Sequence, residues 1–280
     1  MDPAPAVNTN PATTASRDIS PLLVETCPLD SGAWLLLAET WNHLFSQRPD
    51  ASPYVSPIWM QSWLETYGDT LRPELFIART SENVPLGVCL LTRRTRYQAL
   101  LPHVRMHLNC DGENAGHGVV VQHNAILASP GADEQVIQAL AQLISSRRVD
   151  ELAVSGFNET GIRQLSRAFP DWTSETDWRD AHYVDLDFLR ATGTDHISCL
   201  SRNTREQLRR SIKRYRERGE LQLETATTLP QAEAMLDEFI TLHDAHWKSK
   251  GHAGGFANDW RRRFHTAYIR AAFPHGAVQL

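Results

Sequence analysis

The chain has 280 residues, of which 41% are hydrophobic and 8% aromatic, so it can bury a sizeable core in one large or two modest domains. Its formal net charge of -5 argues against a protein that is basic throughout, as a coat for nucleic acid or anionic membrane would be. Any site for a polyanion must therefore be local. Four separated cysteines without a C-x-x-C pair favour reduced thiols and a cytoplasmic protein.

The first 18 residues are rich in Pro, Ala, Asn and Thr and lack the basic start and apolar run of a secretory signal. We expect residues 1–18 to form a disordered leader. No stretch reaches the ~18 uninterrupted apolar residues that a membrane-spanning helix needs. We therefore expect no membrane insertion.

The next 170 or so residues alternate short β-branched runs with amphipathic segments, a pattern that favours an α/β fold. Ser56-Pro57 predicts the start of a helix that Gly68 can end. Strands are predicted at 22–27, 74–79, 84–93, 100–108, 151–155 and 183–188, with a short β-branched run at 119–121, and helices at 34–44, 56–68, 134–146 and 162–168. Three of the strands, 74–79, 84–93 and 100–108, should form an antiparallel meander.

The second part of the chain, from residue 189, begins with a strongly basic segment. It continues with a predicted strand at 221–225 and predicted helices at 231–250 and 258–273, and residues 277–280 have the pattern of a strand that is only beginning. We therefore expect two domains, 19–188 and 189–280, of which the second is cut short.

The basic segment predicts a helix from Asn203, which has Glu206 at capping-box spacing, to Arg218. At about 100° per residue, five cations fall on one narrow stripe beside an apolar stripe. The cations are Arg202, Arg205, Arg209, Lys213 and Arg216. Guanidinium groups bind phosphate oxygens in a fork geometry, so the stripe suits a nucleotide that carries phosphates. A merely solvated basic face explains the pattern equally well.

Two histidines, His243 and His246, lie three residues apart near the end of a predicted helix, before a glycine-containing segment. A zinc site would need a third ligand at standard spacing, which the sequence lacks. An imidazole is suited to take a proton from an ammonium group near neutral pH, so a general base is the better functional interpretation. A packing role remains open.

Other chemistries find little support. Cys110 with His117 and His123 lacks a spacing that fixes a nucleophile beside a base. Neither the phosphate-binding G-x-x-x-x-G-K-[ST] motif nor the G-x-S-x-G motif of serine hydrolases occurs.

The run from Leu200 to Ser211, followed by Tyr215 to Gly219, resembles acetyltransferases of the GNAT superfamily, of the CelD/BcsL-like type associated with cellulose biosynthesis. Leu242-His243 with Trp247, the segment Gly254 to Asn258, and Phe264-His265 agree with the same family in the same order. Looser agreement extends back to about residue 20.

The resemblance implies two tandem GNAT-like units, each a mixed sheet flanked by helices, with acyl-CoA and acceptor held near their junction. Members of the family continue with further strands and a glycine-containing loop that cradles the cofactor, and this sequence ends before them. We therefore expect a C-terminally truncated second unit and leave open whether the chain is an enzyme.

By the same resemblance, the function is transfer of an acetyl or other acyl group from acyl-CoA to an amine or hydroxyl acceptor, linked to exopolysaccharide or cell-envelope synthesis. His243 and His246 would move protons, and Arg205, Arg209 and Lys213 would hold the cofactor phosphates. Trp247, Phe256 and Asn203 would bind substrate.

Two alternatives stay open: a FemAB-like aminoacyltransferase that uses aminoacyl-tRNA, and a noncatalytic binding fragment. We expect a small-molecule, glycan or amine acceptor and no metal or DNA, and we leave a homo-oligomer open.

Overall fold

The structure is a computed structural model that describes residues 21–29, 34–98, 101–110, 112–113 and 117–280. The expected leader, 1–18, lies outside the described residues. In chain order the elements are β1 (Leu23–Pro28), α1 (Trp34–Ser46), η1 (Pro53–Val55), α2 (Pro57–Leu71), β2 (Glu74–Arg79), β3 (Pro85–Gln98), β4 (Leu101–Leu108), β5 (Leu127–Ala128), α3 (Asp133–Ser145), β6 (Glu151–Ala153), α4 (Glu159–Ala168), α5 (Leu186–Thr192), α6 (His196–Cys199), α7 (Arg202–Arg216), α8 (Leu229–Ser249), α9 (Asp259–Ala272) and η2 (Phe273–His275).

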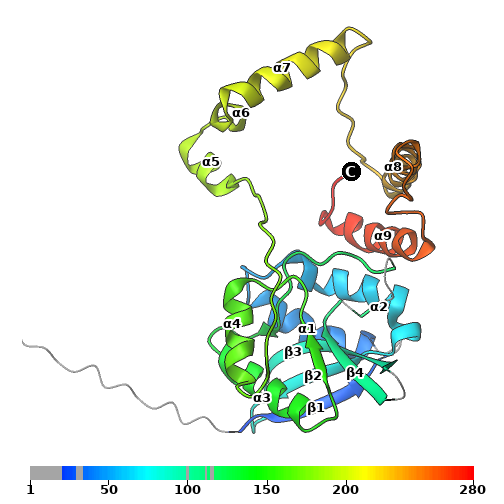
Figure 1. Cartoon of the computed structure of the whole chain (residues 1–280). Helices are drawn as coiled ribbons and strands as arrows, with labels where there is room; N and C mark the ends of the chain where they lie inside the picture. The colour runs from blue at the N-terminus through cyan, green and yellow to red at the C-terminus, as the bar shows by residue number, and fades with distance from the viewer. Residues whose placement is uncertain (1–20, 30–33, 99–100, 111, 114–116) are drawn as a thin grey trace, which may run out of the picture.

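The strands of the described chain form one mixed sheet in the order β1-β2-β3-β4-β6, with β5 paired to β3. The neighbours from β1 to β4 are antiparallel, and β6 runs parallel to β4. The predicted meander of β2, β3 and β4 is confirmed, and so is the α/β class with a mixed sheet flanked by helices (Figure 1).

Alternate side chains of β2 and β3 point to opposite faces of the sheet and so feed two cores. Leu75 and Ile77 pack with α1 and α2, whereas Phe76 and Ala78 pack with α3 and α4. Each face is thus covered by a helical layer, which explains why β2 is apolar almost throughout.

The second helix begins where its sequence predicts and ends later. Ser56 is the N-cap, and its hydroxyl accepts a hydrogen bond from the backbone N–H of Trp59 at 3.3 Å. Gly68 lies inside the helix and not at its end, because Arg72 takes the left-handed conformation (φ 46°) and closes it.

Four segments that the sequence predicts as strands or the beginnings of strands do not form strands in the described chain. Residues 221–225 and 277–280 are irregular, and Val119–Val121 lies in a loop. The expected strand at 183–188 is replaced by the start of α5, because the Asp185 carboxylate caps that helix by accepting from the Phe188 N–H at 2.8 Å.

Helix α9 connects the second part of the chain to the sheet-containing part. Its Phe264 is fully buried in the core that α1 and α2 form with the sheet, and Trp260 stacks on Tyr67 of α2 with ring centroids 5.5 Å apart. The other side of α9 packs with α8 around Ile269 and Leu236. The domain boundary near residue 188 stays a prediction.

The segment that joins the two parts of the chain differs from both of them in its burial. Within residues 173–225, all of which the structure describes, no side chain is buried. We call residues 186–216, which include α5, α6 and α7, the arm. Figure 1 shows the arm extending away from the sheet and from α8 and α9.

Candidate functional site

The candidate site lies where α8 ends and α9 begins. Thr228 starts α8 with a capping box that includes Gln231, and Gly251, with φ 77°, turns the chain after the helix. Asn258 then caps α9 by accepting hydrogen bonds from the first turn. These signals bring the last turns of α8 against the first turn of α9, with residues 250–258 as a loop between them.

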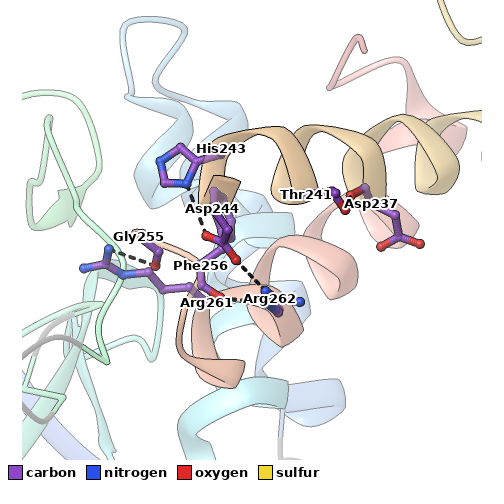
Figure 2. Close-up of polar contacts among 8 residues, drawn as sticks. All are labelled: Asp237, Thr241, His243, Asp244, Gly255, Phe256, Arg261 and Arg262. Carbon is purple, nitrogen blue, oxygen red and sulfur yellow. Dashed lines mark hydrogen bonds and ion pairs between the residues drawn. The ribbon is translucent and has the colours of Figure 1, made fainter. Parts of the chain in front are cut away.

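His243 faces this loop. Its side chain is 23% exposed, and Nδ1 lies 3.4 Å from Oδ1 of Asp244 (Figure 2). The imidazole ring meets Phe256 edge to face, with centroids 5.3 Å apart and an angle of 88°. The contact with Asp244 is long for a hydrogen bond. The ring is therefore oriented by both a carboxylate and an aromatic neighbour.

Asp244 is held more firmly than His243. Its Oδ2 accepts a hydrogen bond from Nη2 of Arg262 at 2.6 Å (Figure 2). A Cβ atom at Gly254 would stand 2.3 Å from Oδ1 of Asp244, so a larger residue there would force the Asp244 carboxylate or the loop to shift.

Two arginines of α9 fix the loop. Arg262 donates from Nε to the Phe256 carbonyl at 2.7 Å, and Arg261 donates from Nη1 to the Gly255 carbonyl at 3.2 Å (Figure 2). Arg261 also donates from Nε to the carbonyl of Gly118 at 2.8 Å, in the long connection that follows β4. The site is thus tied to the sheet-containing part of the chain.

His246 and Trp247 lie at the edge of this cluster. His246 is exposed, and its ring contacts that of Trp247 at 5.9 Å. Trp247 is 38% exposed and also contacts His243 at 6.2 Å, while Lys250 places its Nζ 5.5 Å from the Trp247 ring centre. Of the two predicted proton-transfer residues, only His243 has a carboxylate partner in the described structure.

The predicted cofactor-binding residues lie on α7, the helix that precedes α8 in the chain. Arg209 and Lys213 are exposed and line a shallow hollow that is made by α7 and its C-cap residue, Glu217. Arg205 instead binds its own arm, because Nη1 donates to the carbonyls of Ser198 at 3.1 Å and Leu200 at 2.6 Å. Arg205 therefore braces the turn between α6 and α7.

The predicted cap at Asn203 is wrong. The N-cap of α7 is Ser201, whose hydroxyl accepts from the Thr204 N–H at 3.2 Å, so Asn203 lies in the first turn with an exposed side chain. Glu206 does not form a capping box and pairs with Arg202 at 3.3 Å. Ser201 directly precedes Arg202, the first helical residue, and this is the position from which a side-chain oxygen can cap the first turn.

Comparison with known families identifies the segment that contains both α7 and the His243 cluster. Residues 202–280 match the acetyltransferase (GNAT) domain family. We call these residues the GNAT segment. No curated protein matches the chain significantly.

The solved structures that match part of the chain are distant from it. An integron cassette protein from V. cholerae is 13% identical, with a TM-score of 0.33, and the alignment covers 61% of this chain and 98% of that one. The ribosomal-protein-alanine N-acetyltransferase of Brucella melitensis is 12% identical, with a TM-score of 0.31 and coverage of 58% and 99%. A GCN5-related N-acetyltransferase of Ralstonia eutropha is 12% identical, with a TM-score of 0.33 and coverage of 57% and 98%. Similarity at this level assigns no substrate.

Within the GNAT segment the structure brings together His243, Trp247 and Phe256 and leaves the α7 residues apart. Figure 1 shows α7 standing away from α8, to which residues 217–228 connect it. Arg205, Arg209, Lys213 and Asn203 therefore do not share a site with His243 in this conformation.

Sequence reasoning did not identify Asp244, Arg261 and Arg262 as site residues. A signal was present in α9, which carries three consecutive arginines in its first turns, although the positive end of the helix dipole disfavours cations there. Such an arrangement indicates that the arginines have specific acceptors. Two of them bind loop carbonyls and the Asp244 carboxylate, as described above.

Two further observations concern metal ions and membranes. The described residues contain no group of three or more His, Cys, Asp or Glu side chains placed to hold a metal ion. No helix in the described part of the chain has the length and apolar character to cross a membrane.

Proposed function

We propose that the chain transfers an acyl group, acetyl in the simplest case, from acyl-CoA to an amine acceptor in the cytoplasm, with His243 as the general base. The observation that carries this proposal is the oriented His243 within a segment that matches the acetyltransferase domain family. An ammonium acceptor must lose a proton before it attacks the thioester carbonyl, and an imidazole can accept it near neutral pH. The amine nitrogen then bonds to the carbonyl carbon and the C–S bond breaks. The departing CoA thiolate takes up the second proton that the nitrogen loses as the amide forms.

Asp244 supports this role by its position. A carboxylate next to Nδ1 favours the tautomer that carries its proton on that nitrogen, which leaves Nε2 free to accept a proton. The ion pair with Arg262 keeps Asp244 in place, and Gly255 leaves space beside the ring. Trp247 and Phe256 are then the apolar walls against which an acyl group or acceptor would lie.

The decisive experiment compares His243→Gln with His246→Gln. Both histidines are on α8, three residues apart, and only His243 has the Asp244 contact. With acetyl-CoA and a panel of amines, release of free CoA thiol should fall about 10²- to 10⁴-fold for His243→Gln, the usual range for a lost general base. His246→Gln should stay near the parent rate. Equal losses in both variants, or none in His243→Gln, would contradict the assignment.

Cofactor binding is tested separately on α7. We propose that Arg209 and Lys213 contact the phosphates of the cofactor, whereas Arg205 serves the arm. Calorimetry should therefore show weaker acetyl-CoA binding by Arg209→Ala/Lys213→Ala. The matched control is Arg210→Ala/Arg214→Ala, which removes the same charge from another side of the helix. An equal loss in both would indicate that only the net charge matters.

A FemAB-like aminoacyltransferase is the second candidate, and the composition of α7 favours it. This helix has seven basic residues and one acidic residue, and none of its residues is buried. Such a helix could bind the phosphates of aminoacyl-tRNA, with an affinity that falls steeply as salt rises. Saturable tRNA binding without acetyl-CoA binding would select this candidate. The link to exopolysaccharide or cell-envelope synthesis rests on the resemblance of the run Leu200 to Ser211, and a glycan amine in the acceptor panel tests it.

A further inference from the structure

The inference concerns the apolar stripe of α7. Leu208, Ile212 and Tyr215 follow one another at spacings of four and three residues, which places them on one face of the helix. Their exposed fractions are 39%, 39% and 61%. An amphipathic helix gains most of its stability in a protein by burying such a face. The apolar stripe of α7 is therefore suited to a partner surface that this conformation of the chain does not provide.

A second exposed stripe has the same spacing on α8. Met235, Phe239 and Leu242 are again four and three residues apart. Met235 packs partly against the core between α8 and α9, whereas Phe239 is 54% exposed and Leu242 is 63% exposed. Two helices with this spacing can interdigitate their side chains in the manner of a short coiled coil.

The charges beside the two stripes are opposite. Arg209 and Arg216 flank the α7 stripe, on a helix that is strongly basic throughout. On α8, the exposed Glu238 lies beside Phe239 and Leu242, and Asp237 precedes it. Opposite charges that flank an apolar seam set the choice of partner and the orientation of packed helices.

We propose that α7 of one copy of the chain packs along the exposed face of α8 in a second copy. In return, α7 of the second copy packs along α8 of the first. The conformation of the arm supports a second copy as the partner. Arg205 holds α6 and α7 as one unit through the carbonyls of Ser198 and Leu200, and Figure 1 shows this unit standing away from α8 of its own chain. Reciprocal packing covers both stripes in both copies with a single type of contact, which is the arrangement of a two-fold symmetric dimer.

The dimer also bears on the proposed function. His243 directly follows the exposed Leu242 on α8, so a partner α7 would bring its Arg209 and Lys213 to the side of α8 that carries the candidate base. This consequence rests on the proposed function. The packing itself does not, and it can be tested without acetyl-CoA.

Light scattering after size-exclusion chromatography measures the assembly of the full chain. The parent should be a dimer, and Ile212→Asp or Leu242→Asp should each weaken the dimer at least about 10-fold in Kd, equivalent to about 1.4 kcal/mol. All these side chains are exposed, so the variants should fold. Tyr97→Asp, which changes an exposed aromatic residue on β3, is the matched control and should remain dimeric. Glu238→Arg should weaken the dimer, and Arg209→Glu in the same chain should restore part of the loss.

Disulfide trapping decides which chain supplies α7. In a background with Cys27→Ser and Cys199→Ser, a chain that carries only Ile212→Cys is mixed with a size-tagged chain that carries only Phe239→Cys. Oxidation should give a crosslinked pair of unequal chains, and Arg214→Cys in place of Ile212→Cys should not.

Three results would overturn the proposal. A monomeric parent excludes the dimer. Crosslinking of Ile212→Cys to Phe239→Cys only when both are in one chain means that α7 closes on its own α8. A monomer that binds anionic phospholipid vesicles or RNA through Leu208 and Ile212 means that the stripe serves another partner. If the parent chain forms the dimer but does not bind acetyl-CoA, the result contradicts the proposed function and does not affect the inference of a dimer.

Discussion

Helices α7 and α9 belong to the same GNAT segment and are both amphipathic, yet they have opposite fates in this structure. On α9, Phe264 is fully buried in a core built by α1, α2 and the sheet. On α7, no residue is buried. The spacing of apolar residues therefore predicts that a helix has a face to bury, and it does not say which surface covers that face.

The difference has a physical basis in the side chains. Three aromatic residues of α9, Trp260, Phe264 and Tyr268, meet the aromatic rings of Trp59 and Tyr67 on α2. Aromatic pairs of this kind add to the gain from burial alone. The stripe of α7 has two aliphatic side chains and only one aromatic ring, that of Tyr215, and the surrounding arginines and lysine would have to be matched by acidic partners. Within the described chain, α9 meets its complement and α7 does not.

The largest expected effect separates the two helices directly. Phe264→Ala should destabilise the protein by about 3–5 kcal/mol, because it leaves a cavity in a core that is otherwise filled. Leu208→Ala on α7 should change the free energy of unfolding by less than about 0.5 kcal/mol, the usual limit for an exposed site. Urea unfolding, at a protein concentration at which the chain is monomeric, measures both changes in the free energy of unfolding. Similar losses would show that α7 is packed in solution.

Two glycines sharpen the comparison in the backbone. Gly156 follows β6 with φ 75°, and a Cβ atom there would lie 2.3 Å from the carbonyl oxygen of Val121. Gly193 ends α5 in the arm with φ 63°, and a Cβ atom there would meet nothing within 4 Å. Gly156→Ala should therefore cost about 3 kcal/mol, from left-handed strain plus a clash with backbone.

Gly193→Ala should introduce the left-handed backbone strain without a clash. Thermal unfolding of the sheet-containing part should be almost unchanged in this variant, because the arm is not packed against it. A fall in melting temperature as large as that of Gly156→Ala would mean that the arm and the sheet unfold as one cooperative unit.

Much of the sheet-containing part could be predicted from the sequence, because its signals are local and agree with one another. Ser56-Pro57 starts α2, and the apolar run Glu74–Arg79 is β2 with the predicted bounds. The alternating residues 183–188 carry the same kind of strand signal, yet a strand also needs a neighbour to share its hydrogen bonds. In the described chain this segment has none, and Asp185 caps a helix there instead.

The candidate site shows the same limit. His243 could be singled out because its residue type is chemically informative and a glycine-containing loop follows it. Its surroundings could not, since Asp244 pairs with Arg262 across 18 positions and Arg261 reaches Gly118 across 143. Contacts of that span depend on how α9 packs against α8 and against the sheet-containing part of the chain, which no local pattern encodes.

The smallest expected effect is a dependence on pH, and it too divides the two regions. His265 on α9 packs between Phe256 and Phe264, with ring centroids 5.3 and 5.4 Å away. Burial lowers the pKa of His265 below its ordinary 6.5, and the positive charge of Arg261 lowers the pKa further. The unfolded chain therefore takes up a proton on this histidine at a higher pH than the folded chain does. The stability contributed by a neutral His265 is complete above the unfolded pKa and falls as the pH drops below it.

Acidification from pH 8 to pH 5 should thus lower the melting temperature of the parent more than that of His265→Gln, which cannot take up the proton. His196→Gln, at an exposed position in the arm, should follow the parent at every pH. If the parent and His265→Gln lose stability in parallel, other groups govern the acid response, and α9 is no more sensitive to protonation than the exposed arm.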